Sequence, residues 1–239
     1  MQVPLRRVLP GPDTPVTIAE AYAAPLGHRT DRPWVGLCMV ASIDGSTVVD
    51  GVSGGLSGDN DYDVLLQLRS IADVILVGAG TARGEGYGVP KKQGQRIGVV
   101  TRSGSVDTTT GLFTSGAGFV ITTEGTTIDG ATERGVDVLR AGVDEVDLRR
   151  AVERLPEFCP GTVFVQAEGG PTLNAALADA ELFDELNVTM SPGTVGGDGP
   201  RLFSGGGDHS HRYDLEQLVV DDEAFVFTRW RRRAAPSSP

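Results

Sequence analysis

The segment "ADVILVGAGTARGEG", residues 72–86, is a run of apolar, β-forming residues that ends abruptly in glycines. An unbroken apolar run of this length predicts a strand, residues 73–78, that is buried on both faces of a parallel sheet. Gly78 and Gly80 then predict a tight turn into a helix, with Thr81 in its first turn. In open α/β sheets, ligands bind beyond the carboxyl ends of the strands, where helix N-termini present free N–H groups. The segment therefore predicts an α/β fold with a phosphate-binding turn.

The same alternation of strands and helices continues along the chain. Further strands are predicted at residues 33–42, 96–101, 118–123, 136–141, 162–170 and 183–192, and helices at residues 59–71, 144–155 and 171–180. Two closing strands near residues 213–222 and 224–231 predict an antiparallel C-terminal hairpin. We expect a mostly parallel central sheet with helices on both faces and this hairpin at its edge.

The chain predicts a single domain at residues 34–233, because no linker interrupts the alternating pattern there. Residues 1–33 are rich in proline and polar residues, so we expect an extended N-terminal arm with a short helix at residues 17–23. Residues 234–239 are expected to form a flexible tail.

Composition excludes several classes of function. The 239 residues carry a formal net charge of −11 at pH 7, which repels nucleic acid and anionic membranes. No window approaches the roughly 18 consecutive apolar residues of a membrane span. Cys38 and Cys159 lie far apart, and neither has a histidine at ligand spacing, so we expect no metal site. These features predict a cytoplasmic protein that acts on a small molecule.

A second glycine turn lies in "EGGPTLNAAL", residues 168–177. Gly169 and Gly170 predict a tight turn after the strand, and Pro171 takes the favoured first position of the next helix. Two glycine turns on one sheet indicate a phosphate-bearing cofactor more strongly than either turn alone.

In dinucleotide-binding folds, residues about 20 positions after the first glycine turn distinguish NAD from NADPH. A fold that selects NAD carries an acidic residue there, whereas this chain has Thr101, Arg102 and Ser103. These residues suit a 2′-phosphate and favour NADPH, although a solvated loop arginine is an equal alternative. A conventional Rossmann dehydrogenase is disfavoured because the third glycine, Gly84, comes one position late.

Four motifs together resemble one known family. They are "MVASIDG" (39–45), "ADVILVGAGTARGEGYG" (72–88), "VFVQAEGGPTLNAAL" (163–177) and "LFDELNVTMSPGTVGGDGPRLF" (182–203). Over about residues 33–230 the chain resembles the reductase domain of the bifunctional riboflavin-biosynthesis deaminase/reductase, which has a dihydrofolate-reductase-like fold. The zinc signature of deaminases is absent, so the resemblance is to a stand-alone pyrimidine reductase.

The resemblance implies an activity and a cofactor site. Members reduce the ribosyl group of 5-amino-6-(5-phosphoribosylamino)uracil with NADPH, and the resemblance also suggests a homodimer. It further suggests a cis peptide between Gly169 and Gly170. The residues implied to bind the cofactor are Val40, Ala41, Gly78, Ala79, Gly80, Thr81, Thr101, Arg102, Ser103, Glu168, Gly169, Gly170, Pro171, Thr172 and Leu173.

The acceptor end departs from the family pattern. Family members continue after the first turn into Asp-Asp-Pro, where this chain has "ARGEGYGVP", and Ser46 replaces a basic residue. We expect Asp44 and Glu85 to act in catalysis and Ser42, Asp44, Asp63 and Glu85 to contact the substrate, unless these carboxylates only stabilise turns. Dihydrofolate-reductase-like activity, or a nucleotide-binding sensor without chemistry, remains an alternative.

Overall fold

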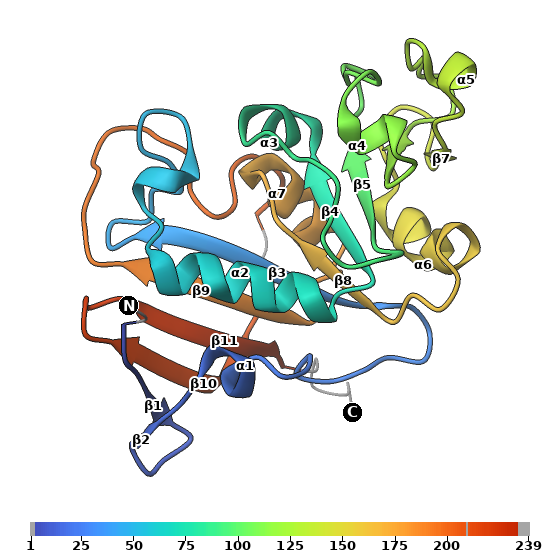
Figure 1. Ribbon diagram of the computed structural model, residues 1–239. Coiled ribbons are helices and arrows are strands. Elements are labelled where there is room, and N and C mark those ends of the chain that lie inside the picture. The colour runs from blue at the N-terminus through green and yellow to red at the C-terminus, as the bar shows by residue number, and fades with distance from the viewer. Residues whose placement is uncertain (1–2, 209, 234–239) are drawn as a thin grey trace.

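The computed structural model describes residues 3–208 and 210–233, so the expected tail at 234–239 lies outside the described residues. One eleven-stranded sheet spans this part of the chain in the order β2-β1-β10-β11-β9-β3-β8-β4-β5-β6-β7 (Figure 1). Its strands are β1 (Leu5–Leu9), β2 (Thr14–Pro15), β3 (Trp34–Ser42), β4 (Val74–Gly78), β5 (Arg96–Val100), β6 (Gly118–Thr122), β7 (Val138–Arg140), β8 (Phe164–Ala167), β9 (Glu185–Ser191), β10 (Tyr213–Asp221) and β11 (Val226–Arg232).

The predicted fold class is confirmed. Strands β9, β3, β8, β4, β5, β6 and β7 pair in parallel, and β10 and β11 form the antiparallel hairpin beside β9. The helices are α1 (Ile18–Ala21), α2 (Asp59–Ile71), α3 (Ala79–Gly84), α4 (Gly111–Thr114), α5 (Ala131–Arg134), α6 (Leu148–Phe158) and α7 (Pro171–Asp179), with a 3₁₀ turn, η1, at Ser53–Gly55.

Side chains of β4 show why its sequence is an unbroken apolar run. Val74 and Leu76 join the core beneath α6 and α7, whereas Ile75 and Val77 join the core on the opposite face, with α4 and α5. All four are fully buried. A strand covered on both faces cannot carry a polar side chain at alternate positions, so period-two alternation disappears.

Helix boundaries follow from capping. Helix α2 occupies the predicted residues 59–71 and has acidic residues in its first turn, which the helix dipole favours. Helix α6 begins at Leu148, later than the predicted residue 144, because the Asp147 side chain accepts a hydrogen bond from the Arg150 N–H and acts as the N-cap.

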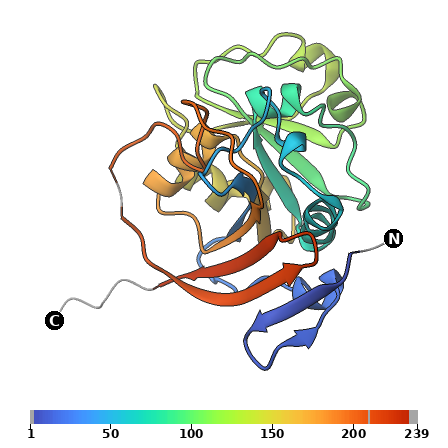
Figure 2. The ribbon, with the colours of Figure 1, turned by 90° about the vertical axis from the view of Figure 1, so that its left-hand side faces the viewer.

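The N-terminal segment is more ordered than the expected extended arm. Strand β1 pairs antiparallel with β10, and β2 pairs with β1, so both extend the same sheet beside the C-terminal hairpin (Figure 2). Helix α1 lies within the predicted residues 17–23, and a capping box between Thr17 and Glu20 caps its N-terminus. Pairing with β1 covers the backbone groups of β10 that would otherwise form an open edge.

Candidate functional site

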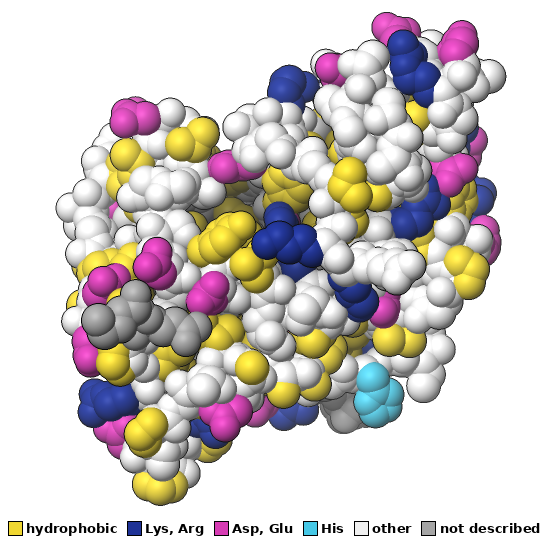
Figure 3. Space-filling view, viewed as in Figure 1, with side chains coloured by type: hydrophobic (Ala, Val, Ile, Leu, Met, Phe, Trp, Pro, Cys, Tyr) yellow, Lys and Arg dark blue, Asp and Glu magenta, His cyan; other side chains and the backbone are white. Residues whose placement is uncertain are grey.

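A cavity of about 950 Å³ opens at the carboxyl ends of β3, β4 and β8. Its walls come from β3, from η1 and α2, from α3 with the segment that follows it, and from the turn after β8. The hollow lies near the centre of the face drawn in Figure 3, where hydrophobic and basic side chains are adjacent. Its place at the strand ends is the one at which α/β sheets bind ligands.

The two predicted glycine turns meet at one end of this cavity. The Gly78 N–H donates to the Gly169 carbonyl at 2.7 Å, and the Gly169–Gly170 peptide is cis, as the resemblance suggested. A Cβ atom on Gly170 would lie 2.5 Å from Thr81 Oγ1, so a side chain there would displace Thr81. The two turns therefore form a close-packed cradle that requires glycine at position 170.

Several of the expected cofactor residues line this end of the cavity: Val40, Gly80, Thr81, Glu168, Gly170 and Pro171. Ala41 is buried beside Val40, and Leu173 packs into the core under α7. Ala79 and Thr172 are in the first turns of α3 and α7 but do not line the cavity. The structure thus brings the predicted turn residues together at one end of the cavity.

Residues 101–103 follow β5, whose end lies beside the first turn because Gly78 pairs with Val100. Thr101 is buried and accepts a hydrogen bond from the Gly104 N–H at 3.1 Å. The exposed Arg102 forms an ion pair with Glu145 at 2.6 Å. None of residues 101–103 lines the cavity, so they lie farther along the same edge of the sheet.

Asp44 holds a loop and does not line the cavity. Its carboxylate accepts hydrogen bonds from Ser42 Oγ at 2.5 Å, from the Val195 N–H at 3.1 Å and from the Gly196 N–H at 2.7 Å. The Ser42 hydroxyl and then these backbone groups lower the pKa of Asp44 to about 2. Ser42 and Asp44 thus anchor the loop at residues 193–201, and a direct role of either in catalysis stays a prediction.

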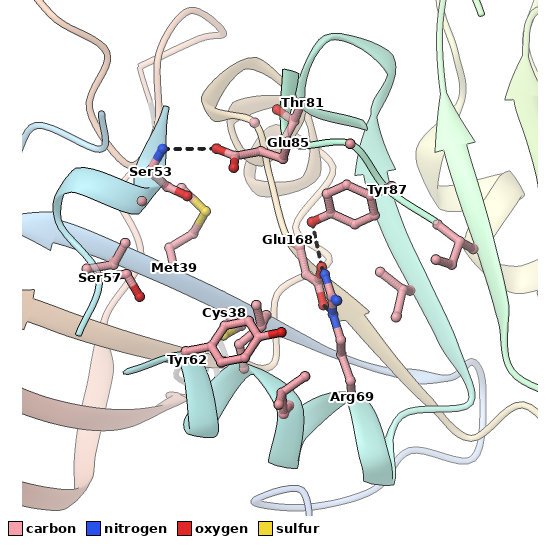
Figure 4. A pocket seen from close by; sticks show the side chains of 18 of the residues that line it. Cys38, Met39, Ser53, Ser57, Tyr62, Arg69, Thr81, Glu85, Tyr87 and Glu168 are labelled. Carbon is pink, nitrogen blue, oxygen red and sulfur yellow. Dashed lines mark hydrogen bonds and ion pairs between the residues drawn. The ribbon is translucent and has the colours of Figure 1, made fainter. Parts of the chain in front are cut away.

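Glu85 and Asp63 differ in their positions. Glu85 lines the cavity, follows α3, and accepts a hydrogen bond from the Ser53 N–H at 2.9 Å (Figure 4). Asp63 does not line the cavity, whereas Asp61, two residues earlier on α2, does. A shift of two residues turns a helical side chain to nearly the opposite side of the helix.

Asp61 is a candidate site residue that the sequence analysis did not single out, because several polar side chains occupy the first turns of α2. Ser57 Oγ donates to its carboxylate at 2.5 Å, and burial raises the pKa of the Asp61 carboxyl. No ion pair between described residues includes Asp61. Helical spacing could have indicated Asp61. Asp61, Leu65 and Arg69 recur every four residues, so they share one face of α2, and all three line the cavity.

Glu168 lies at the centre of a buried polar network. Its Oε1 accepts hydrogen bonds from Arg69 Nε at 2.8 Å and Gln166 Nε2 at 2.6 Å, and its Oε2 accepts from Arg69 Nη2 and the Tyr87 hydroxyl, each at 2.6 Å (Figure 4). Burial alone would lower the pKa of Arg69, but its hydrogen bond with Glu168 and the charge of that residue raise it above its usual value. Burial, and then the charge of Glu168, raise the pKa of Tyr87, so its hydroxyl stays protonated and donates.

Among the described residues, no group of three or more His, Cys, Asp or Glu side chains could hold a metal ion. The thiols of Cys38 and Cys159 are both free, and Cys38 lines the cavity. No helix in the described ranges is long and apolar enough to cross a membrane.

Comparison with known proteins identifies relatives of this chain. A riboflavin biosynthesis protein RibD of Bacillus amyloliquefaciens is 30% identical over 195 residues, which cover 76% of this chain and 52% of that protein. A 2,5-diamino-6-ribosylamino-4(3H)-pyrimidinone 5′-phosphate reductase of Methanothermobacter thermautotrophicus is 28% identical over 179 residues, 70% of this chain and 81% of that protein. The chain spans about half the length of the RibD proteins that it matches.

Solved structures share the fold. A pyrimidine reductase-like protein of Corynebacterium diphtheriae superposes with a TM-score of 0.78 at 25% identity, covering 92% of this chain and 100% of that one. The riboflavin biosynthesis reductase of Saccharomyces cerevisiae has a TM-score of 0.67 at 20% identity, covering 87% and 93%. The family profile described as the RibD C-terminal domain matches residues 33–227. The chain therefore belongs to the RibD C-terminal domain family.

Proposed function

We propose that this protein is an NADPH-dependent reductase that acts on 5-amino-6-(5-phosphoribosylamino)uracil or a related pyrimidine or pteridine. The observation that carries the proposal is the cradle in which Gly78, Gly169, Gly170 and Thr81 pack together at one end of the cavity. A phosphate group needs such close approach to backbone N–H groups. Membership of the RibD C-terminal domain family supports the same activity.

The residues present fit NADPH, because Gly170 has no space for a Cβ atom beside Thr81 and both turns lead into helix N-termini. Gly80, Thr81 and Gly170 would hold the pyrophosphate, and the backbone at Val40 would lie against the nicotinamide. Arg102 would reach the 2′-phosphate by leaving its exposed ion pair with Glu145. When bound, the cofactor supplies a hydride.

The acceptor would occupy the part of the cavity lined by α2 and η1. Asp61 is the carboxylate best suited to recognise its heterocycle, because Ser57 occupies only part of its acceptor capacity and it lacks a cationic partner among the described ion pairs. A carboxylate accepts two adjacent N–H groups of a pyrimidine in a bidentate contact. Glu85, at the rim, would hold or relay the proton.

Position within the sheet supports this assignment. Hydrogen bonding with Thr189 favours the charged form of Asp61, and Thr189 pairs with Val40 in the parallel register of β3 and β9. Asp61 therefore contacts β9 at the residue that pairs with Val40 of β3, whose backbone would face the nicotinamide. Hydride transfer needs this proximity between the acceptor and the cofactor.

We also propose that the protein is a cytoplasmic homodimer. Leu186, Val188 and Met190 point to one face of β9, where they are less buried than the residues between them. Trp230 of β11 pairs with Leu186 and extends this stripe. Leu186 also packs against the core beneath α6 and α7, and Met190 is exposed, so the stripe leads from the core to the surface. An apolar stripe that reaches the surface is typical of an interface between copies.

The test is steady-state oxidation of NADPH by the purified protein, with the phosphoribosylamino-uracil and with dihydrofolate as separate acceptors. Turnover with the first supports the proposal, and turnover with dihydrofolate alone would favour the dihydrofolate-reductase-like alternative. NADPH binding without turnover over a broad set of acceptors would favour a nucleotide-binding sensor.

A further inference from the structure

Glu168 connects three walls of the cavity. Arg69 reaches it from α2, Tyr87 reaches it from the segment after α3, and Glu168 itself directly follows β8 (Figure 4). Tyr87 is also tied to α3, since its N–H donates to the Ala82 carbonyl at 3.0 Å. A displacement of either donor would therefore be transmitted to the end of β8.

The backbone next to Glu168 forms the cradle. The Glu168 N–H donates to the Leu76 carbonyl of β4 at 2.9 Å, and the adjacent Gly169 carbonyl accepts from the Gly78 N–H at 2.7 Å. Because Gly170 already lies against Thr81, the turn has little room to move without losing these contacts. Only Gly169 thus separates Glu168, whose carboxylate is held by Arg69 and Tyr87, from Gly170, which would contact the phosphate.

The buried negative charge of Glu168 makes its position depend on the side chains that pair with it. Glu168 is only 5% exposed, and Arg69 is its cationic partner, with the guanidinium 5.1 Å from the centre of the Tyr87 ring. Removing one partner of a buried ion pair leaves an uncompensated charge, which must take up a proton or turn toward water. Either response would pull on the turn that follows.

We propose that Arg69 and Tyr87 are positioning residues for the cofactor: acting through Glu168, they hold the Gly169–Gly170 turn against the Gly78 turn. The inference rests on the proposed function, because it takes NADPH as the occupant of the cradle. The two oxygens of Glu168 already accept four hydrogen bonds from the protein, as a tether between these elements requires.

The experiment measures the dissociation constant of NADPH by fluorescence titration, which requires no acceptor. Tyr87→Phe keeps the ring and removes one donor, and we expect NADPH to bind about threefold to tenfold more weakly. Arg69→Met should weaken binding by at least about tenfold, with Arg69→Lys in between because a lysine keeps the charge but not the bidentate geometry. Combining Arg69→Met with Glu168→Gln should recover part of the loss.

Arg32→Met is the matched control. Arg32 is buried and forms a bidentate pair with Asp184 at 2.7 and 3.0 Å, at the amino ends of β3 and β9 and thus at the opposite edge of the parallel sheet. This variant should lose stability as Arg69→Met does, yet bind NADPH with wild-type affinity.

The outcomes separate the two proposals. Wild-type protein that binds no NADPH would refute the proposed function and this inference with it. Wild-type binding together with unchanged affinity in Tyr87→Phe and Arg69→Met would refute the inference alone. Equal weakening in Arg69→Met and Arg32→Met would also refute it, because the effect would then be general destabilisation.

Discussion

Asp61→Asn separates recognition of the acceptor from binding of the cofactor. The substitution keeps the shape of the side chain and an oxygen that can accept from Ser57, but it removes the charge and replaces one acceptor by a donor. A bidentate contact with two N–H groups of a heterocycle is then lost. The cradle is formed by other residues, so NADPH affinity should stay within about twofold of wild type.

The size of the effect follows from the position of Asp61. A hydrogen bond to a charged group contributes about 1.5–3 kcal/mol, so losing the two bonds of a bidentate contact should lower kcat/KM for the acceptor about 10²–10⁴-fold. Burial raises the pKa of Asp61 above its usual 3.8, so the folded protein binds this proton more tightly than the unfolded chain does. Stability is therefore lost as pH rises from 3.8 through the raised pKa, and Asp61→Asn should raise the free energy of unfolding at pH 7 by on the order of 1 kcal/mol.

Two neighbours on α2 provide matched controls for NADPH oxidation and urea unfolding. Asp59→Asn and Asp63→Asn alter carboxylates that do not line the cavity, so both should keep near wild-type turnover. Full activity in Asp61→Asn toward every accepted heterocycle would refute the assignment. A large loss in Asp63→Asn with none in Asp61→Asn would support the assignment made from the sequence instead.

Three further variants test other parts of the molecule. Asp44→Asn should make the loop at residues 193–201 more susceptible to proteolysis. In wild-type protein the ionised Asp44 stabilises this loop above pH 3.8. The stabilisation is lost as pH falls from 3.8 toward the lowered pKa of about 2, so only there should the wild-type loop become equally susceptible. A loop equally protected in the variant would contradict the anchoring role. Arg102→Ala should weaken NADPH binding by roughly 1–3 kcal/mol while leaving NADH unaffected, and equal weakening in titrations of both would show that Arg102 does not touch the 2′-phosphate. Sedimentation should give twice the 25.1 kDa chain mass, and Met190→Glu, at a position 39% exposed, should give monomers; a monomeric wild type would reject the dimer.

Features encoded by local sequence were predicted well. The apolar run of β4 and the paired glycines at residues 169 and 170 each specify their own conformation, through burial on two faces and through a turn without space for a side chain. Strand β1 was missed because its "LRRVL" sequence lacks clear alternation, and its pairing with β10 depends on residues more than 200 positions away. Helices α4 and α5 have four residues each, too few for a periodic pattern.

The site residues that were missed depend on contacts distant in sequence. Arg69 could have paired with an acidic residue of its own helix, yet it pairs with Glu168, 99 positions later. Tyr87 lies in the segment where the family motif is absent, so no pattern indicated its bond to Glu168. Both become recognisable only when α2, β8 and the segment after α3 are brought together.

Asp44 and Asp61 illustrate why a carboxylate at a strand end is an ambiguous signal. The carboxyl edge of a parallel sheet holds both the ligand and the loops that surround it, so an acidic side chain there can serve either. Asp44 accepts hydrogen bonds from the Ser42 hydroxyl and from backbone N–H groups 151 and 152 positions away, which lower its pKa and fix a loop. Burial raises the pKa of Asp61, although its hydroxyl partners act in the opposite direction, and the carboxylate keeps acceptor capacity toward the cavity. Backbone donors satisfy a structural carboxylate, whereas a carboxylate left incompletely satisfied inside a cavity is stabilised only when its ligand supplies the missing donors.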